Sequence, residues 1–193
     1  MPLGVHKVAL FGVAGVSTGS AVLLETAVAS DDTSIEFTLP TDYKQVTFKI
    51  INMAPAASSY PQFQVSTGGS FDTTVTSTAF NAYHYSTGSV SGMNYRPSES
   101  QAQGTNYQDF GGYIGSQSER CGCIALTLAN PSSDTFVKHW WARSSSMNAD
   151  GTPYALQDHI AGYWNTSSPL TSISFICSDG NISSGTIKMW GIK

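Results

Sequence analysis

The chain has 193 residues, of which 40% are hydrophobic and only 11% are charged, and its formal net charge is -4. A chain of this length fits one domain whose core is large enough to fold without metals or disulfides. The low charge content is unlike that of a charge-rich helical protein. The acidic balance provides no basic field for nucleic acid, so composition argues against a nucleic-acid-binding protein.

The N-terminal segment carries an uncharged apolar run, Val8–Val16. The run imitates the core of a secretory signal peptide and is too short to span a bilayer. Gly12 and Gly15 oppose a helix, and they allow an extended chain to lie flat against another backbone. We therefore expect residues 1–30 to form an extended arm that holds the protein in an assembly. An N-terminal strand folded back on its own domain is the alternative. The residues expected to make the assembly contacts are Val8, Leu10, Phe11, Val13 and Val16.

Residues 31–193 consist of short β-prone runs separated by turn-rich polar stretches. This spacing predicts an all-β domain, an antiparallel β-sandwich of jelly-roll-like form. The expected strands are Ser34–Leu39, Gln45–Met53, Gln62–Ser66, Tyr83–Tyr85, Cys123–Leu128, Thr135–Arg143, Ile160–Trp164, Leu170–Cys177 and Gly185–Ile192. Alternation of apolar and polar residues predicts which side chains share the buried face. The expected core residues are Val46, Phe48, Ile50, Leu126, Leu128, Ile173 and Phe175.

The last two expected strands, Leu170–Cys177 and Gly185–Ile192, are joined by a polar loop and should pair as a terminal hairpin. Two longer stretches, Gly68–Asn81 and Gly88–Ser118, are rich in small polar residues and should form surface loops or protruding hairpins, where partners are met. Exposed tyrosine offers contact area for sugars or proteins, although ordinary packing is the alternative. The residues expected to contact a receptor are Tyr95, Tyr107 and Tyr113.

The sequence has no recognisable catalytic or metal-binding motif. It lacks a Gly-x-Ser-x-Gly elbow, a His-Glu-x-x-His pair, a P-loop and a dinucleotide fingerprint. A calcium loop that would start at Asn148 has His159 where the essential Glu should stand. Paired carboxylates could still meet from distant strands, as in glycosidases, but most Asp residues fall at expected turns. We therefore expect no catalytic residue, no metal and no cofactor, and a protein that is not an enzyme.

The three cysteines should be free thiols, as in a protein that assembles in the cytosol. Cys121 and Cys123 share one face of an extended segment, so they are poorly placed to bridge to each other. A bridge from Cys177 to one of them across strands is the alternative. The adjacent Trp140 and Trp141 must face opposite sides of their strand, which places one of them at an interface or under a loop.

Four segments of the chain carry a likeness to known proteins: Met1–Gly12, Ala79–His84, Asn130–Ser133 and Ser183–Lys193. Together they resemble small virion structural proteins, decoration or tail-fibre-like, of marine tailed bacteriophages. The likeness extends over nearly the whole chain. It implies a non-enzymatic protein on the particle surface, assembled in the host cytoplasm. The implied partners are capsid or tail subunits and further copies of the chain, a trimer being one candidate.

Two roles are compatible with this resemblance. A capsid decoration or cement protein is the first expectation, because the sequence has no long repetitive shaft of the kind that fibres carry. A tail-fibre or head-fibre protein that contacts host-surface glycans is the alternative.

Overall fold

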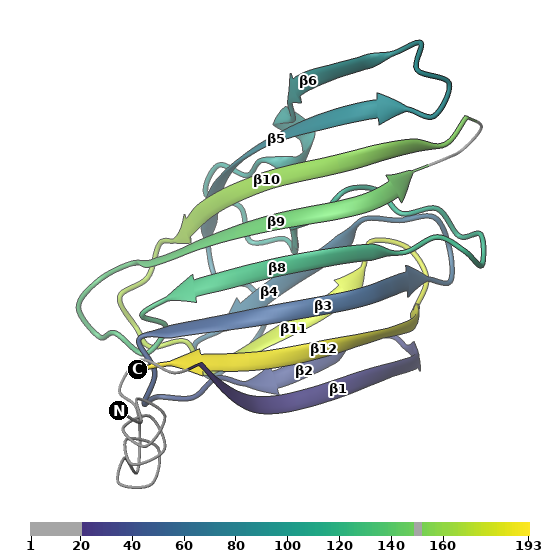
Figure 1. Cartoon of the computed structure of the whole chain (residues 1–193). Helices are drawn as coiled ribbons and strands as arrows, with labels where there is room; N and C mark the ends of the chain where they lie inside the picture. Colours follow the sequence, from purple (N-terminus) through teal and green to yellow (C-terminus); the bar gives the residue numbers. More distant parts are fainter. Residues whose placement is uncertain (1–20, 149–151) are drawn as a thin grey trace, which may run out of the picture.

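The computed structural model describes residues 21–148 and 152–193, which form two antiparallel sheets packed face to face (Figure 1). The larger sheet contains, in spatial order, β1 (Val22–Asp32), β12 (Ile182–Ile192), β3 (Gln45–Pro55), β8 (Gly122–Ala129), β9 (Lys138–Asn148), β10 (Tyr154–Trp164), β5 (Val75–Tyr85) and β6 (Ser91–Tyr95). The smaller sheet contains β2 (Ile35–Thr38), β11 (Ser172–Cys177), β4 (Pro61–Ser66) and β7 (Gln108–Asp109). One 3-10 turn, η1 (Pro97–Glu99), follows β6. The predicted antiparallel β-sandwich is confirmed, while its jelly-roll form stays a prediction.

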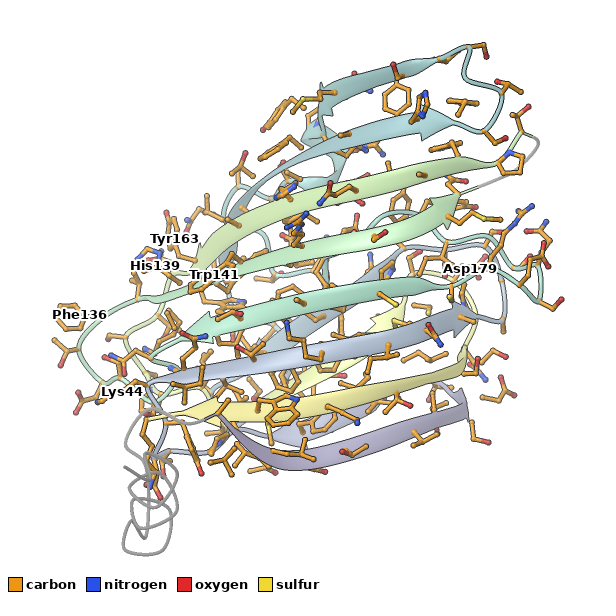
Figure 2. The ribbon with its side chains drawn as sticks, viewed as in Figure 1. Lys44, Phe136, His139, Trp141, Tyr163 and Asp179 are labelled. Atoms are coloured by element: carbon orange, nitrogen blue, oxygen red, sulfur yellow. The ribbon has the colours of Figure 1, made fainter. Side chains whose placement is uncertain are left out.

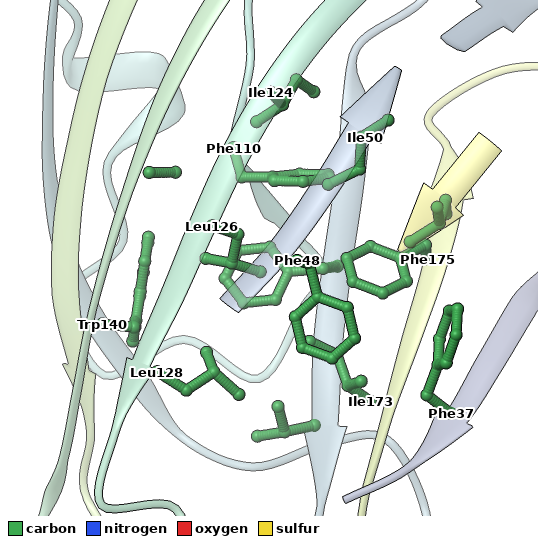
Figure 3. Packing of buried hydrophobic residues seen from close by; sticks show 14 of the residues in the cluster. Phe37, Phe48, Ile50, Phe110, Ile124, Leu126, Leu128, Trp140, Ile173 and Phe175 are labelled. Carbon is green, nitrogen blue, oxygen red and sulfur yellow. The ribbon is translucent and has the colours of Figure 1, made fainter. Parts of the chain in front are cut away.

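The core lies between the two sheets and is rich in aromatic rings (Figure 3). The Phe48 ring of β3 packs edge-on against Phe175 of β11 and Phe37 of β2, with ring centroids 5.1 Å and 5.4 Å apart. Such edge-to-face pairs add to the stabilisation that apolar burial gives. All seven predicted core residues are buried, with at most 2% of each side chain exposed, which confirms the predicted alternation: Val46, Phe48, Ile50, Leu126, Leu128, Ile173 and Phe175.

The expected boundary between arm and sandwich at residue 31 is wrong. Strand β1 pairs with β12 from Val22 opposite Gly191 to Asp32 opposite Ile182, so the sandwich begins at Val22. A register shift between Leu23 and Glu25 breaks the alternation of β1, which is why its sequence does not look like a strand. The five expected assembly residues lie outside the described part of the chain: Val8, Leu10, Phe11, Val13 and Val16.

The expected terminal hairpin is also wrong, because β11 and β12 belong to different sheets. Strand β11 pairs with β2 and β4, whereas β12 pairs with β1 and β3. The chain likewise passes from one sheet to the other between β1 and β2, between β3 and β4, and between β7 and β8. Alternation within a strand says which face is buried and does not say which sheet the strand joins.

The stretch expected as a loop at residues 68–81 contains the first half of β5, which starts at Val75. Strand β5 extends the larger sheet beyond the smaller one, together with β10 and β6, and segments between residues 96 and 121 lie behind this extension (Figure 1). Gly112 lets one such segment approach the sheet, because a Cβ there would collide with Leu156 and Asp158 of β10. In the described part of the chain, no helix could span a membrane.

Candidate functional site

A pocket of about 340 Å³ lies on the inner face of the larger sheet, where that sheet extends past the smaller one. This volume is at the small end of the range of about 300–1,000 Å³ for ligand sites. We call it the tyrosine pocket. Its lining residues are Tyr60, Asn81, Tyr83, Tyr85, Val90, Asn94, Arg96, Tyr113, Asn148, Tyr154 and Leu156.

Three of the tyrosines come from paired strands of the sheet. Tyr83 and Tyr85 are two residues apart in β5, so both side chains point to the inner face. Tyr154 is the cross-strand partner of Tyr85 in β10, and the two rings stack with centroids 4.6 Å apart and planes 19° apart. Tyr83 lies edge-on to both of them. The sheet therefore presents a fixed aromatic wall, because each ring is braced by another.

The remaining two tyrosines enter from the connections near the smaller sheet. Tyr60 and Tyr113 follow and precede the bridge between Ser59 and Ile114, and their rings meet edge-on with centroids 5.0 Å apart. All five tyrosines are partly exposed. Tyrosine rings and their hydroxyl groups therefore line the pocket both from the larger sheet and from the connections opposite it.

The polar lining is supplied by three asparagines and one arginine. Asn148 donates a 2.5 Å hydrogen bond to the hydroxyl of Tyr154, and Arg96 donates one of 3.3 Å to the hydroxyl of Tyr60. The Arg96 guanidinium also donates to Glu99, with 2.8 Å between Nε and Oε1. Because Glu99 is buried, this ion pair holds the Arg96 side chain in place. The charge of Arg96 also compensates the buried charge of Glu99.

Two further carboxyl groups lie near this ion pair, Asp158, which is buried, and Asp109, which is half-buried. Burial raises the pKa of Asp158 in β10 to about 6, against a hydrogen bond of 2.9 Å donated by Ser144. Burial also raises the pKa of Asp109 in β7 to about 6, against a 2.7 Å hydrogen bond donated by Gln62. The charge of Glu99 adds to both increases. Desolvation therefore dominates, and the neutral form of each carboxyl group is favoured below a pH of about 6.

The same surroundings affect Tyr60. Burial, followed by the charge of Glu99, raises the pKa of the Tyr60 hydroxyl above 10.0, although Arg96 opposes the increase. Tyr60 therefore stays a neutral hydroxyl that can both donate and accept hydrogen bonds.

The structure brings only one of the three expected receptor residues into the pocket. Tyr113 lines it, whereas Tyr95 points to the opposite face of the sheet with 63% of its side chain exposed. Tyr107 lines a separate polar hollow beside Gln101 and Asn106.

The three expected receptor residues did not include Tyr60, Tyr83, Tyr85 or Tyr154. A signal was present in β5, where Tyr83 and Tyr85 are separated by one residue and must share a face if the segment is a strand. The pairing of β5 with β10, which brings Tyr154 beside Tyr85, has no such local signal.

The described residues contain no group of three His, Cys, Asp or Glu side chains arranged to hold a metal ion. Cys177 is buried in the smaller sheet, while Cys121 and Cys123 both lie near the side-chain oxygen of Asn52, at 3.7 Å and 3.6 Å.

Comparisons of the chain with protein-family models, with curated proteins and with solved structures find no match.

Proposed function

We propose that this protein is a non-enzymatic structural protein on the surface of a tailed phage particle, and that the tyrosine pocket binds a saccharide there. The observation that carries the saccharide site is the set of five partly exposed tyrosines around a hollow of about 340 Å³. The virion assignment is supported by the resemblance of four segments of the sequence to small virion proteins.

Saccharides suit this pocket because their two kinds of surface match its lining. The carbon-bound hydrogens of a sugar ring pack against aromatic faces, such as those of Tyr83, Tyr85 and Tyr154. Its hydroxyl groups need partners that both donate and accept, and the amides of Asn81, Asn94 and Asn148 provide both. The stacked rings are already in place, so little ordering cost opposes binding.

The arrangement favours binding over hydrolysis. Glycoside hydrolysis requires two carboxyl groups that flank the bond to be cleaved. Among the described residues that line the pocket, none is a carboxylate, and the side chains of Glu99 and Asp158 are buried behind it. Glu99 pairs with Arg96, and Asp158 accepts a hydrogen bond from Ser144 of the neighbouring strand. A sugar bound in the pocket would therefore not reach either carboxyl group.

The strand order supports a jelly roll, which we infer as the underlying connectivity. The orders β1-β12-β3-β8 and β2-β11-β4-β7 match two four-stranded sheets in which consecutive strands pass from one sheet to the other. Strands β5, β6, β9 and β10 then extend the first of these sheets. Jelly rolls occur in both viral capsid proteins and lectins, so this connectivity agrees with both halves of the proposal.

Two places in the particle are compatible with these features. Capsid decoration is the first candidate, and a tail-fibre or head-fibre protein that contacts host glycans is the second. The tyrosine pocket favours the second, because a decoration protein needs no saccharide site. Electron microscopy of particles labelled with antibody against this chain distinguishes capsid from tail.

Saccharide binding is tested with the purified full chain on an array of neutral and acidic glycans, followed by calorimetry with the best ligand. We expect Tyr85→Ala to weaken binding by about tenfold or more, which corresponds to about 1.4 kcal/mol. Tyr95→Ala is the matched control, because Tyr95 faces the other side of the same sheet. The saccharide proposal fails if no glycan binds, or if Tyr95→Ala abolishes binding while Tyr85→Ala leaves it intact.

A further inference from the structure

A second surface, on the outer face of the larger sheet, is apolar and rich in aromatic residues. Trp140 and Trp141 face opposite sides of β9 as expected, and Trp141 is 47% exposed on the outer face. Near it are Phe136, which is 67% exposed, His139 and Tyr163 (Figure 2). The rings of His139 and Tyr163 are 6.1 Å apart.

The surface continues across the sheet to the edge strand. The cross-strand register runs from Trp141 through Thr127 and Thr47 to Trp190, and from Trp190 to Leu23 of β1. Thr47 and Thr127, in the middle of this row, are buried, and their hydroxyl groups form a 3.2 Å hydrogen bond with each other. Across five strands this row measures about 19 Å, at about 4.8 Å per strand. We define the aromatic strip as Leu23, Trp190, Trp141, Phe136, His139 and Tyr163.

The exposed end of the aromatic strip is held in a fixed conformation. The backbone N–H of Phe136 donates a 3.0 Å hydrogen bond to the Ser133 hydroxyl. The ammonium group of Lys138, whose side chain is buried, donates hydrogen bonds of 2.8 Å to the Phe136 carbonyl and 3.3 Å to the Thr166 carbonyl. Phe136 is thus presented to solvent by a constrained loop. An exposed apolar surface on a rigid support is typical of a protein interface.

The aromatic strip lies beside the point where the N-terminal segment joins the sheet. Val22, the first residue of β1, pairs with Gly191 next to the Leu23–Trp190 pair. The N-terminal run Val8–Val16 contains no charged residue and includes Leu10 and Phe11, so it could cover aromatic side chains without burying a charge. Extended at about 3.3 Å per residue, these nine residues span about 30 Å, enough to cross the aromatic strip.

We propose that the aromatic strip binds the Val8–Val16 segment of a second copy of this chain. The direction of β1 favours a second copy over the same one. β1 starts at the end of the sheet where the aromatic strip lies and runs away from it (Figure 1). An extended continuation before Val22 therefore points past the end of its own sheet, toward a neighbouring subunit. This inference is independent of the saccharide pocket, which is on the other face.

Three full-length proteins test the inference by analytical ultracentrifugation over the micromolar range. They are the natural sequence, a segment variant with Leu10→Ser and Phe11→Ser, and a strip variant with Phe136→Ser and Trp141→Ser. The natural sequence should self-associate, and each variant alone should associate at least tenfold more weakly. Equal amounts of the two variants should form complexes when mixed, because the intact segment of the strip variant can bind the intact aromatic strip of the segment variant.

Met93→Ser is the matched control, since Met93 is 71% exposed on β6, away from the aromatic strip. It should associate like the natural sequence. A natural sequence that stays monomeric overturns the proposal and would fit binding within one chain. A mixture of the two variants that forms no complex overturns it as well. Circular dichroism checks that each variant is folded, and the segment variant keeps the test decisive if the strip variant is not.

Discussion

Gly92 of β6 lies directly opposite Tyr83 of β5, and a Cβ at position 92 would come within 2.9 Å of the Tyr83 hydroxyl oxygen. The absence of a side chain at this position leaves the space in which the Tyr83 ring stands. A Cβ at position 92 would therefore push the Tyr83 ring aside, out of the aromatic wall of the tyrosine pocket.

We therefore expect Gly92→Ala to reduce saccharide affinity several-fold while it changes stability by less than about 1 kcal/mol, because alanine also lowers the entropy of the unfolded chain. Calorimetry measures the first effect and thermal unfolding the second. Gly69→Ala is the control, since a Cβ there would meet no atom within 4 Å. Unchanged affinity in Gly92→Ala would mean that Tyr83 takes no part in binding.

The raised pKa values of Asp158 and Asp109 predict that the free energy of unfolding falls as pH rises. Folding raises the pKa of Asp158 from 3.8 to about 6, so between these values the folded state binds more protons than the unfolded state. The stabilisation by the neutral form is complete below the unfolded pKa and is lost as pH increases through about 6. Asp109 should act in the same direction. Urea unfolding of the natural sequence at pH 4.5 and pH 7.5 measures the fall.

Asp158→Asn should remove the part of this pH-dependent loss of stability that is due to Asp158. The amide keeps an oxygen that can accept the hydrogen bond from Ser144, and it carries no charge. The variant should be more stable than the natural sequence by about 3 kcal/mol at pH 7.5 and by only about 1 kcal/mol at pH 4.5. Asp179→Asn, which makes the same change at an exposed position, is the control variant. A destabilised Asp158→Asn variant at pH 7.5 would show that the ionised carboxylate is required.

Phe48→Ala should be the most damaging of the simple core substitutions. The Phe48 ring is fully buried and touches Phe37 and Phe175, so its removal leaves a cavity between the two sheets. We expect a loss of about 3–5 kcal/mol in the free energy of unfolding, measured by chemical denaturation. Phe80→Ala, at a ring that is 43% exposed, should cost less. Equal losses in the two variants would contradict the predicted cavity.

The three cysteines should react with a thiol reagent in a fixed order. Cys123 is exposed and should react first, whereas burial raises the pKa of Cys121 and of Cys177. Cys177 is buried in β11, so it should be labelled only after unfolding. Mass spectrometry of digested samples taken over time identifies each modified residue. Labelling of Cys177 in the folded protein at the rate of Cys123 would contradict the position of β11.

The sequence was sufficient to predict the class of fold and the buried face of several strands. Strict alternation around Phe48 and around Leu126 can be produced only by a strand with one side in the core. Strand β1 was hidden because its register shift at Leu24 interrupts the alternation, and because only one of its faces meets the protein.

The candidate site was harder to predict because its parts come together through pairing between distant strands. Tyr154 reaches Tyr85 only because β10 lies next to β5, and nothing local to either residue specifies that neighbour. Tyr113 lines the pocket, whereas the side to which Tyr95 points depends on the register of β6. The burial that raises the pKa of Asp158 likewise comes from segments far along the chain, such as Gly112.

The pairing of β1 with β12 also affects the order in which the molecule can form. Val22 and Gly191 meet in one ladder although almost the whole described chain separates them. During synthesis at about 5–20 residues per second, β1 leaves the ribosome many seconds before β12 exists. Strand β3 also lacks one of its two neighbours until then, since β12 lies between β3 and β1. The larger sheet therefore cannot be completed during translation, and its apolar edges need protection from other nascent chains until the β12 segment has emerged.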